Sequence, residues 1–229
     1  MDLYESVVVP KGAQAAVKKR SLTVEVFFDF VCPWCLIGKR QFDAAARKLA
    51  ELRPDVDLHV VWRSHALLPD TPVDGLPYQA FYVARLGSPE AVARRRAQVQ
   101  QAGIAAGVRF AFDRIEVLPN TAKAHARVAR ASQAQQAKLI DRIFTAYFLE
   151  GQDIGDGSVL ERLALECELQ AEVRGVHGGV GPGAGEGHAA GARYPVPGVP
   201  FFVFDGSLAL SGATASDTVL DVMLRALGP

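Results

Sequence analysis

The sequence predicts an α/β fold whose strands are separated by a long helical region. Residues 22–30 and 56–62 are rich in β-branched and aromatic side chains, which is typical of buried strands. A helical repeat of apolar side chains lies between them, from residue 33 to residue 52. Strand character returns only at residues 199–204, after a stretch that is mostly helical to about residue 173. The two ends of the chain therefore supply the strands, and the middle supplies helices.

One face of the first predicted helix is apolar and the other is charged. Pro33 suits the first turn, because its missing N–H would be unpaired there in any residue. Arg53-Pro54 ends the helix. The apolar positions are Cys35, Phe42, Ala45, Ala46, Leu49 and Leu52. The charged positions are Lys39, Arg40, Asp43 and Lys48.

The middle region carries several helix start signals. Ser88 and Asn120 are residues that often cap a helix N-terminus. Ser158 and Glu161 have the spacing of a capping box. Residues 139–148 are apolar around most of the helix, which predicts a central position.

The C-terminal part returns to the strand pattern and ends in a helix. Asp205-Gly206 predicts a turn between a strand at 199–204 and a shorter one at 207–210. A last helix starts at Thr214 or Ser216.

Glycine is concentrated at residues 175–191. Each glycine costs a helix roughly 1 kcal/mol relative to alanine, so we expect a loop in this tract.

Composition and charge narrow the class of protein. Apolar residues make up 49% of the chain and charged residues 22%, which supports a folded core. Lysine plus arginine and aspartate plus glutamate each total 25, so the formal net charge is zero and nucleic acid is a poor partner. No apolar stretch approaches the length of a membrane helix, so we expect no membrane association. The N-terminus lacks the plan of an export signal, so we expect a cytoplasmic protein.

The spacing of the cysteines points to chemistry. Cys32 and Cys35 form a close pair, and Cys167 stands alone in another region. In a reducing compartment such a pair is usually redox-active or metal-binding. A zinc site needs two further ligands at short spacing, and no second pair is present, so we expect no metal. The second structural alternative to redox chemistry is that the two cysteines are a chance pair in the core.

The position of the pair favours thiol–disulfide exchange. Cys32 falls where the strand ends and the helix begins, and the unpaired N–H groups and the helix dipole favour a thiolate there. Cys35 lies one turn later, close enough to attack a mixed disulfide formed at Cys32. Because Cys35 points to the apolar face, we predict that Cys32 is the nucleophile and Cys35 a buried resolving thiol.

Several motifs together resemble the DsbA-like thioredoxin superfamily, in particular its FrnE-type branch. The first motif is Phe28-Asp29-Phe30-Val31-Cys32-Pro33-Trp34-Cys35, continued by Leu36-Ile37-Gly38-Lys39-Arg40. The others are Asn120-Thr121-Ala122 with Ala124-His125, the segments 144–148 and 151–154, the run Gly198-Val199-Pro200-Phe201-Phe202-Val203, and residues 211–213. The resemblance covers about residues 22–227.

The resemblance implies a thioredoxin fold with an α-helical domain inserted after the second strand. On this basis residues 1–21 form an N-terminal arm, and residues 22–64 and 192–229 form the thioredoxin-like domain. Residues 65–191 form the helical insertion, with the glycine-rich loop at 175–191.

The resemblance also implies an activity and a substrate groove. The Val199–Pro200 bond is expected to be cis and to lie beside Cys32, where the backbone of Val199 can pair with an extended substrate. The implied function is a thiol–disulfide oxidoreductase that acts on protein or small-molecule disulfides and thiols. The alternative is a glutathione-dependent isomerase or transferase resembling 2-hydroxychromene-2-carboxylate isomerase. No bound cofactor is expected; glutathione is a candidate co-substrate, and a homodimer is an open alternative.

Other residues have a functional and a structural interpretation. Pro33 and Trp34 lie between the cysteines, and we expect them to contact the substrate. His125 either faces the cleft as a substrate contact or is satisfied by local hydrogen bonds. Asp29 is either a proton acceptor for Cys35 or a structural residue at the strand end. We expect packing at Cys167 and a solvated face at Arg94-Arg95-Arg96.

Overall fold

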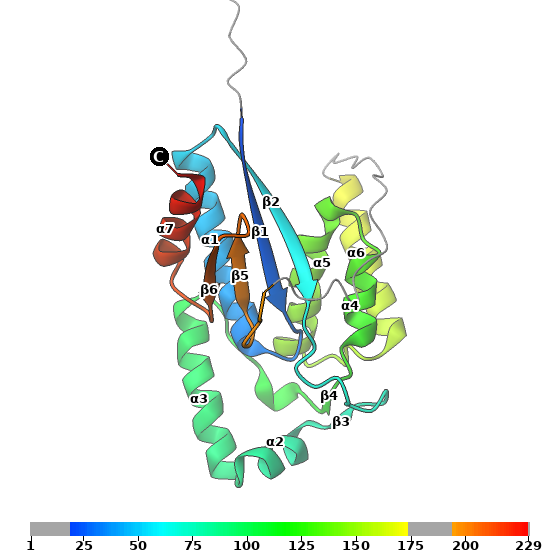
Figure 1. Ribbon diagram of the computed structural model, residues 1–229. Helices are drawn as coiled ribbons and strands as arrows, with labels where there is room; N and C mark the ends of the chain where they lie inside the picture. The colour runs from blue at the N-terminus through cyan, green and yellow to red at the C-terminus, as the bar shows by residue number, and fades with distance from the viewer. Residues whose placement is uncertain (1–18, 174–193, 229) are drawn as a thin grey trace, which may run out of the picture.

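The computed structural model describes residues 19–173 and 194–228 of the chain. Most of the predicted arm at 1–21 and the whole glycine-rich tract at 175–191 lie outside the described residues. Figure 1 shows a central sheet, with α1 (Pro33–Leu52) and α7 (Ser216–Leu227) together on one side of it. The α/β fold with a helical insertion is confirmed.

The main sheet joins the two ends of the chain. Its strand order is β2 (Val56–Ser64), β1 (Arg20–Phe28), β5 (Phe201–Phe204) and β6 (Leu208–Ser211). β1 runs parallel to β2, with α1 as the connection, and antiparallel to β5, with Val24 opposite Phe204. The turn predicted at Asp205-Gly206 is present between β5 and β6. Both residues have positive φ. The topology is that of a thioredoxin fold.

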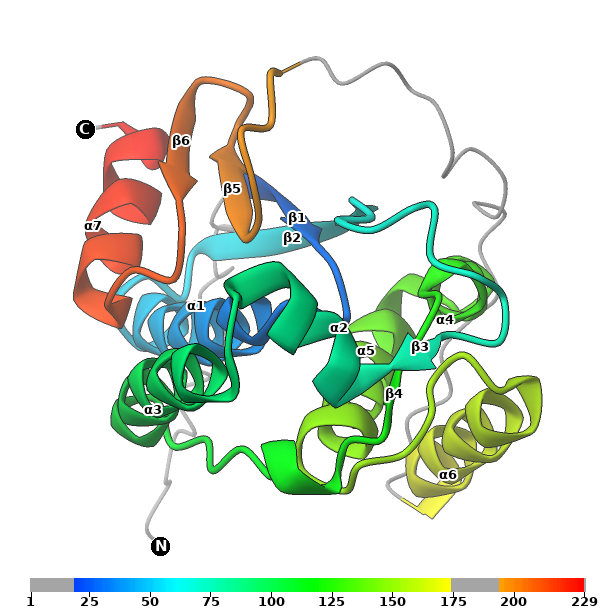
Figure 2. The same cartoon turned by 90° about the horizontal axis from the view of Figure 1, so that it is seen from below.

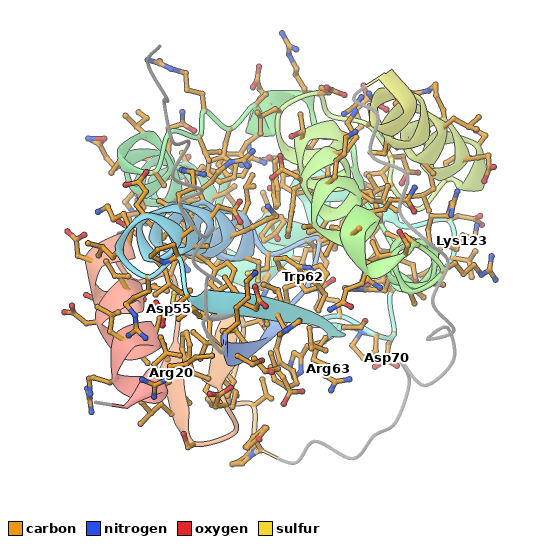
Figure 3. All side chains as sticks on the ribbon, turned by 90° about the horizontal axis from the view of Figure 1, so that it is seen from above. Arg20, Asp55, Trp62, Arg63, Asp70 and Lys123 are labelled. Atoms are coloured by element: carbon orange, nitrogen blue, oxygen red, sulfur yellow. The ribbon has the colours of Figure 1, made fainter. Side chains whose placement is uncertain are left out.

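Side chains of alternating residues face the two sides of this sheet. Leu22, Val24 and Val26 of β1 are buried against α1 and α7, together with Phe42 and Met223. The opposite face of β1 and β5 carries a smaller cluster formed by Phe27, Phe201 and Val203, on which Tyr194, Val196 and Val199 pack. On β2, Trp62 and Arg63 lie on opposite sides of the strand (Figure 3).

The insertion runs from β2 to β5 and contains most of the helices. Its elements are β3 (Leu76–Pro77), α2 (Tyr78–Leu86), α3 (Pro89–Ala105), the 3-10 turn η1 (Phe112–Arg114), β4 (Val117–Leu118), α4 (Ala122–Ala129), α5 (Gln133–Phe148) and α6 (Gly157–Val173). Figure 2 shows α2 and α3 at the end of the molecule where α1 begins, with α4, α5 and α6 grouped beyond them. As predicted, α5 is central: Ile140, Ile143 and Phe144 are almost completely buried. The two-residue pair β3–β4 is too short to give a strand pattern in the sequence.

The helix start signals are confirmed in part. Ser88 Oγ accepts the N–H of Ala91 at 3.1 Å and caps α3. Asn120 Oδ1 accepts the N–H of Ala122 at 2.9 Å, although the capping position of α4 is Thr121. The capping box predicted at Ser158 is wrong, because α6 begins one residue earlier.

Asp156 takes the place of that capping box. Asp156 immediately precedes α6, and its Oδ1 accepts the N–H of Ser158, the second residue of the helix, at 2.7 Å. The last helix begins at Ser216, the second of the two predicted starts.

Lys39 differs from the prediction of a charged outer face on α1. Its side chain is only 6% exposed, with Nζ 2.7 Å from Asp43 and 3.3 Å from Asp141 of α5, over the ring of Trp62. The same Asp141 also pairs with Arg40. The insertion covers this part of α1, and its Asp141 adds a second carboxylate to that of Asp43 around the buried ammonium. Helical periodicity alone does not reveal such a partner.

Candidate functional site

The sulfur of Cys32 lies at the N-terminus of α1. β1 ends at Phe28, and a turn closed by the hydrogen bond from Cys32 N–H to Asp29 O leads into the helix. Cys32 is the N-cap of α1 and Pro33 follows it at the first helical position. The N–H of Cys35 donates to Cys32 Sγ at 3.2 Å. This amide and the helix dipole stabilise negative charge on the sulfur.

The segment before β5 contacts the same sulfur. The Cys32 thiol donates to the carbonyl of Val199, with Sγ and O 3.6 Å apart. The Val199–Pro200 bond is cis, and Pro200 O accepts the N–H of Gly212 at 2.8 Å. Gly38 on α1 makes the close approach possible: a Cβ atom there would lie 2.8 Å from Pro200 Cγ. Residues that are distant in sequence therefore meet at Cys32.

Cys35 is the more deeply buried of the two thiols, 2% exposed against 5% for Cys32. Burial raises the pKa of the Cys35 thiol well above its usual value, and the hydrogen bond and charge interaction with Cys32 raise it further. The charge of Asp29 adds to this rise, whereas a backbone hydrogen bond with Asp29 opposes it. Cys35 therefore stays a protonated thiol near neutral pH.

Asp29 and His125 form a buried pair beside the cysteines. His125 Nε2 lies 3.1 Å from Asp29 Oδ1, and Asp29 Oδ2 accepts the N–H of Leu67 at 2.8 Å. Asp29 is completely buried, and the imidazole of His125 packs against Phe28 and Phe30. The sequence singled out both residues separately, but nothing in it links them across 96 positions.

A pocket of about 400 Å³ opens next to Cys32. Of the predicted substrate contacts, Pro33, Trp34 and Val199 line it. Pro200 lies behind Val199 against Gly38, and the predicted substrate contact at His125 is not supported by its position, because its ring is turned into the core. The far wall comes from α2 and α3.

Two arginines of this wall were predicted to lie on a solvated face. Arg95 and Arg96 both line the pocket, whereas Arg94 does not. The guanidinium of Arg95 lies 5.8 Å from the centre of the Trp34 ring, and that of Arg96 lies 5.1 Å from the centre of the Tyr78 ring. No sequence pattern signals this contact, since it depends on how α3 docks against the start of α1.

Residues 23–223 match the family model of the DsbA-like thioredoxin domain. The chain belongs to this family. The match spans both strand-bearing ends and the helical insertion, so it covers the whole site described above. DsbA-like family members are typically oxidoreductases or isomerases, and this supports an enzyme here as well.

Individual relatives agree with this assignment. A probable DsbA oxidoreductase from Streptomyces coelicolor is similar in structure, with a TM-score of 0.73 and 26% identity over 90% of each chain. A putative protein disulfide isomerase from Nitrosomonas europaea shares the fold, with a TM-score of 0.54 and 13% identity over 90% of this chain and 98% of the other.

An uncharacterized protein of Bacillus subtilis (strain 168) is 26% identical over 147 residues, which are 64% of this chain. The matched part spans 66% of that protein's length. Among the helices of the described residues, none is long and apolar enough to cross a membrane.

Proposed function

We propose that this DsbA-like protein is a thiol–disulfide oxidoreductase in which Cys32 is the nucleophile and Cys35 the resolving thiol. The observation that carries the proposal is the position of Cys32 Sγ, which accepts the N–H of Cys35 and borders an open pocket. A second thiol one helical turn away gives the site the two sulfurs that a complete exchange needs.

In the first step the Cys32 thiolate attacks one sulfur of a substrate disulfide. A bond forms between Cys32 Sγ and that sulfur, the substrate S–S bond breaks, and the second substrate sulfur leaves as a thiolate. The N-terminus of α1 stabilises the attacking thiolate before the bond forms. The carbonyl of Val199, 3.6 Å from Cys32 Sγ, lies beside the incoming substrate.

In the second step Cys35 attacks Cys32 Sγ. The mixed disulfide breaks, a Cys32–Cys35 disulfide forms, and the remaining substrate sulfur leaves as a thiolate that takes up a proton. Cys35 must first lose its own proton, and its raised pKa makes an acceptor necessary. Asp29 is the acceptor in this proposal. It lies close enough to Cys35 for its charge to raise the pKa of that thiol, and His125 and Leu67 orient its buried carboxylate.

The substrate disulfide is reduced and the enzyme oxidised by these two steps. Two equivalents of an external thiol return the enzyme to the dithiol form, and glutathione is the thiol that we propose for this role. The same two steps in reverse oxidise a substrate dithiol, and the reduction potential of the Cys32–Cys35 couple decides the direction of exchange. We propose the cytoplasm as its location, where thiols are kept reduced.

Two serine variants test the division of labour. Cys35→Ser keeps the nucleophile and removes the resolving group, so hydroxyethyl disulfide should leave a stable adduct on Cys32. Cys32→Ser should give no adduct and no turnover, because Cys35 is buried and protonated. Mass spectrometry of peptides from each variant locates the adduct.

Two outcomes would contradict the proposal. One is an adduct found mainly on Cys35. The other is a fast glutathione-dependent isomerisation that needs Cys32 but not Cys35, because this would favour the isomerase class and leave the second thiol without a role.

A further inference from the structure

The pocket beside Cys32 combines aromatic walls with positive charge. Its aromatic lining includes Trp34, Tyr78, Phe81, Tyr82 and Phe112. Three arginines, Arg85, Arg95 and Arg96, also line it, and no aspartate or glutamate does so among the described residues. A pocket of about 400 Å³ falls in the usual range for small-molecule sites, which is roughly 300–1,000 Å³.

Arg96 is held in place by contacts that leave its charge unneutralised. Its guanidinium lies over the rings of Tyr78 and Phe112, and Nη2 donates to Gln79 Oε1 at 2.7 Å. Its Nε is buried and makes no hydrogen bond with any of the described residues. Within the part of the chain that the structure describes, no carboxylate lies within 4.0 Å of its guanidinium.

Arg95 places a second charge over Trp34 of the cysteine motif. Its guanidinium lies over the ring of Trp34, which stands between the two cysteines, and Nη1 makes only a long contact of 3.4 Å with Gln98. Among the described residues it also has no carboxylate partner. Arginines that pack inside other parts of the described chain have such partners: Arg142 pairs with Glu150 and Glu166. Exposed arginines such as Arg94 can lack one, but Arg95 and Arg96 differ from Arg94 because they line a pocket whose lining, in the described part of the chain, contains no aspartate or glutamate.

We propose that this pocket selects small disulfides that carry a carboxylate, and that Arg95 and Arg96 are the residues that set this specificity. The proposal rests on the thiol–disulfide exchange proposed above. Arginine donates paired hydrogen bonds to a carboxylate, and such charge-assisted bonds are stronger in a partly desolvated pocket than in water. The aromatic walls cover the apolar part of the same molecule while its sulfur meets Cys32.

A charge series of aliphatic disulfides of similar size tests this specificity. Dithiodipropionate carries two negative charges, hydroxyethyl disulfide is neutral, and cystamine carries two positive charges. We expect Arg95→Gln and Arg96→Gln each to lower kcat/KM for dithiodipropionate by about tenfold or more, since each substitution removes a charge-assisted hydrogen bond to the carboxylate. The value for hydroxyethyl disulfide should stay within about twofold, and that for cystamine should stay the same or rise.

The matched control is Arg94→Gln, one position earlier on the same helix. Arg94 is exposed and does not line the pocket, so its replacement should change none of the three values. Comparing each variant with the parent protein on the same disulfide cancels the different intrinsic reactivities of the three compounds. Near-physiological salt, about 0.15 M, suppresses the effect of distant charges.

The outcomes separate the two proposals. If the parent protein reduces none of the three disulfides, the exchange function itself is wrong. If it reduces any of them, and neither arginine variant lowers the rate with dithiodipropionate selectively, the specificity proposal is wrong. Faster reduction of an unfolded protein disulfide than of dithiodipropionate would also overturn it, in favour of a polypeptide substrate. Arg95 is exposed, so its variant remains informative even if Arg96→Gln fails to fold.

Discussion

The two walls of the site are built in different ways. On the wall formed by the start of α1 and the segment before β5, the polar groups find partners inside the protein: Cys32 Sγ with Cys35 N–H, and Asp29 with His125 and Leu67. On the wall formed by α2 and α3, arginine charges remain without carboxylate partners among the described residues. The polar groups of the first wall, which holds the reacting sulfurs, are paired without a ligand. The arginines of the second wall can still pair with an acidic ligand. We infer that the chemistry resides in the first wall and selectivity in the second.

Gly38→Ala disrupts the first wall and, among substitutions that keep both Cys32 and Cys35, should have the largest effect on exchange. The new methyl group would lie 2.8 Å from Pro200 Cγ, and a proline ring cannot swing away as a flexible side chain can. Alanine normally stabilises a helix interior, but here overpacking should cost about 1–3 kcal/mol in the free energy of unfolding. Displacement of Val199 from Cys32 should also slow exchange by about tenfold or more. Urea unfolding and single-turnover kinetics measure the two effects.

Gly157→Ala is the matched control for that substitution. Gly157 is the first residue of α6, its φ is not positive, and no atom lies within 4 Å of the position a Cβ would take. The control protein should be as stable as the parent or slightly more so, with unchanged exchange. If Gly38→Ala behaves in the same way, Pro200 does not depend on this contact for its position.

Asp29→Asn should affect only the second step of exchange. Asparagine keeps the shape and can still accept the N–H of Leu67, but it cannot take up a proton from Cys35 near pH 7. The adduct on Cys32 should form at the normal rate and resolve about tenfold more slowly. Loss of a general base slows a reaction by about 10²-fold or more, and the lower pKa of Cys35 without the charge of Asp29 offsets part of that loss. Rapid quenching with acid followed by mass spectrometry separates the two rates.

A purely electrostatic role for Asp29 predicts the opposite sign. The charge of Asp29 raises the pKa of Cys35, so its removal would lower that pKa and make the resolving thiolate more abundant. Resolution that is equal or faster in the asparagine variant would therefore exclude Asp29 as the proton acceptor.

The first wall could be predicted from the sequence because most of it is local. The strand at β1, Pro33 and the spacing of the cysteines place Cys32 at a helix N-terminus without any tertiary information. The approach of Val199 needed the resemblance to a known family, since no pattern in the chain brings residue 199 to residue 32.

The second wall could not be predicted, because helical periodicity shows only which residues share a face of α3 and not what that face contacts. Arg94, Arg95 and Arg96 spread around α3, and only the docking of α3 decides which two reach the pocket. The contact of Lys39 with Asp141 and the pair formed by Asp29 and His125 were missed for the same reason: each joins residues from distant elements. Burial of a charge is a tertiary property, and local patterns do not report it.

The raised pKa of Cys35 predicts a pH dependence of stability within the first wall. The protonated thiol is favoured in the folded state, so this contribution is complete below the pKa of an unfolded thiol, about 8.5, and is lost as the pH rises toward the folded value. The reduced protein should lose up to about 1.4 kcal/mol for each pH unit in this range relative to Cys35→Ala. Urea unfolding under a reductant between about pH 7.5 and pH 10 tests this.

The same comparison removes the contribution of the tyrosines. Burial also raises the pKa values of Tyr82 and Tyr147, so both destabilise the protein at still higher pH. They are present in both proteins and cancel in the difference. Parallel stability curves for the two proteins would mean that Cys35 titrates with the same pKa in the folded and unfolded states.

Cys167→Ala should have the smallest effect on exchange, and it tests whether the inserted helices supply a third reactive thiol. Cys167 is 5% exposed and packs in the large core cluster that also contains Cys32 and Cys35, but it does not line the pocket. Alanine fills most of its volume, so unfolding should become easier by about 1 kcal/mol, while adduct formation and resolution at Cys32 stay unchanged. A slower resolution in this variant would mean that Cys167 takes part in exchange, and the insertion would then contribute to the chemistry as well as to the pocket.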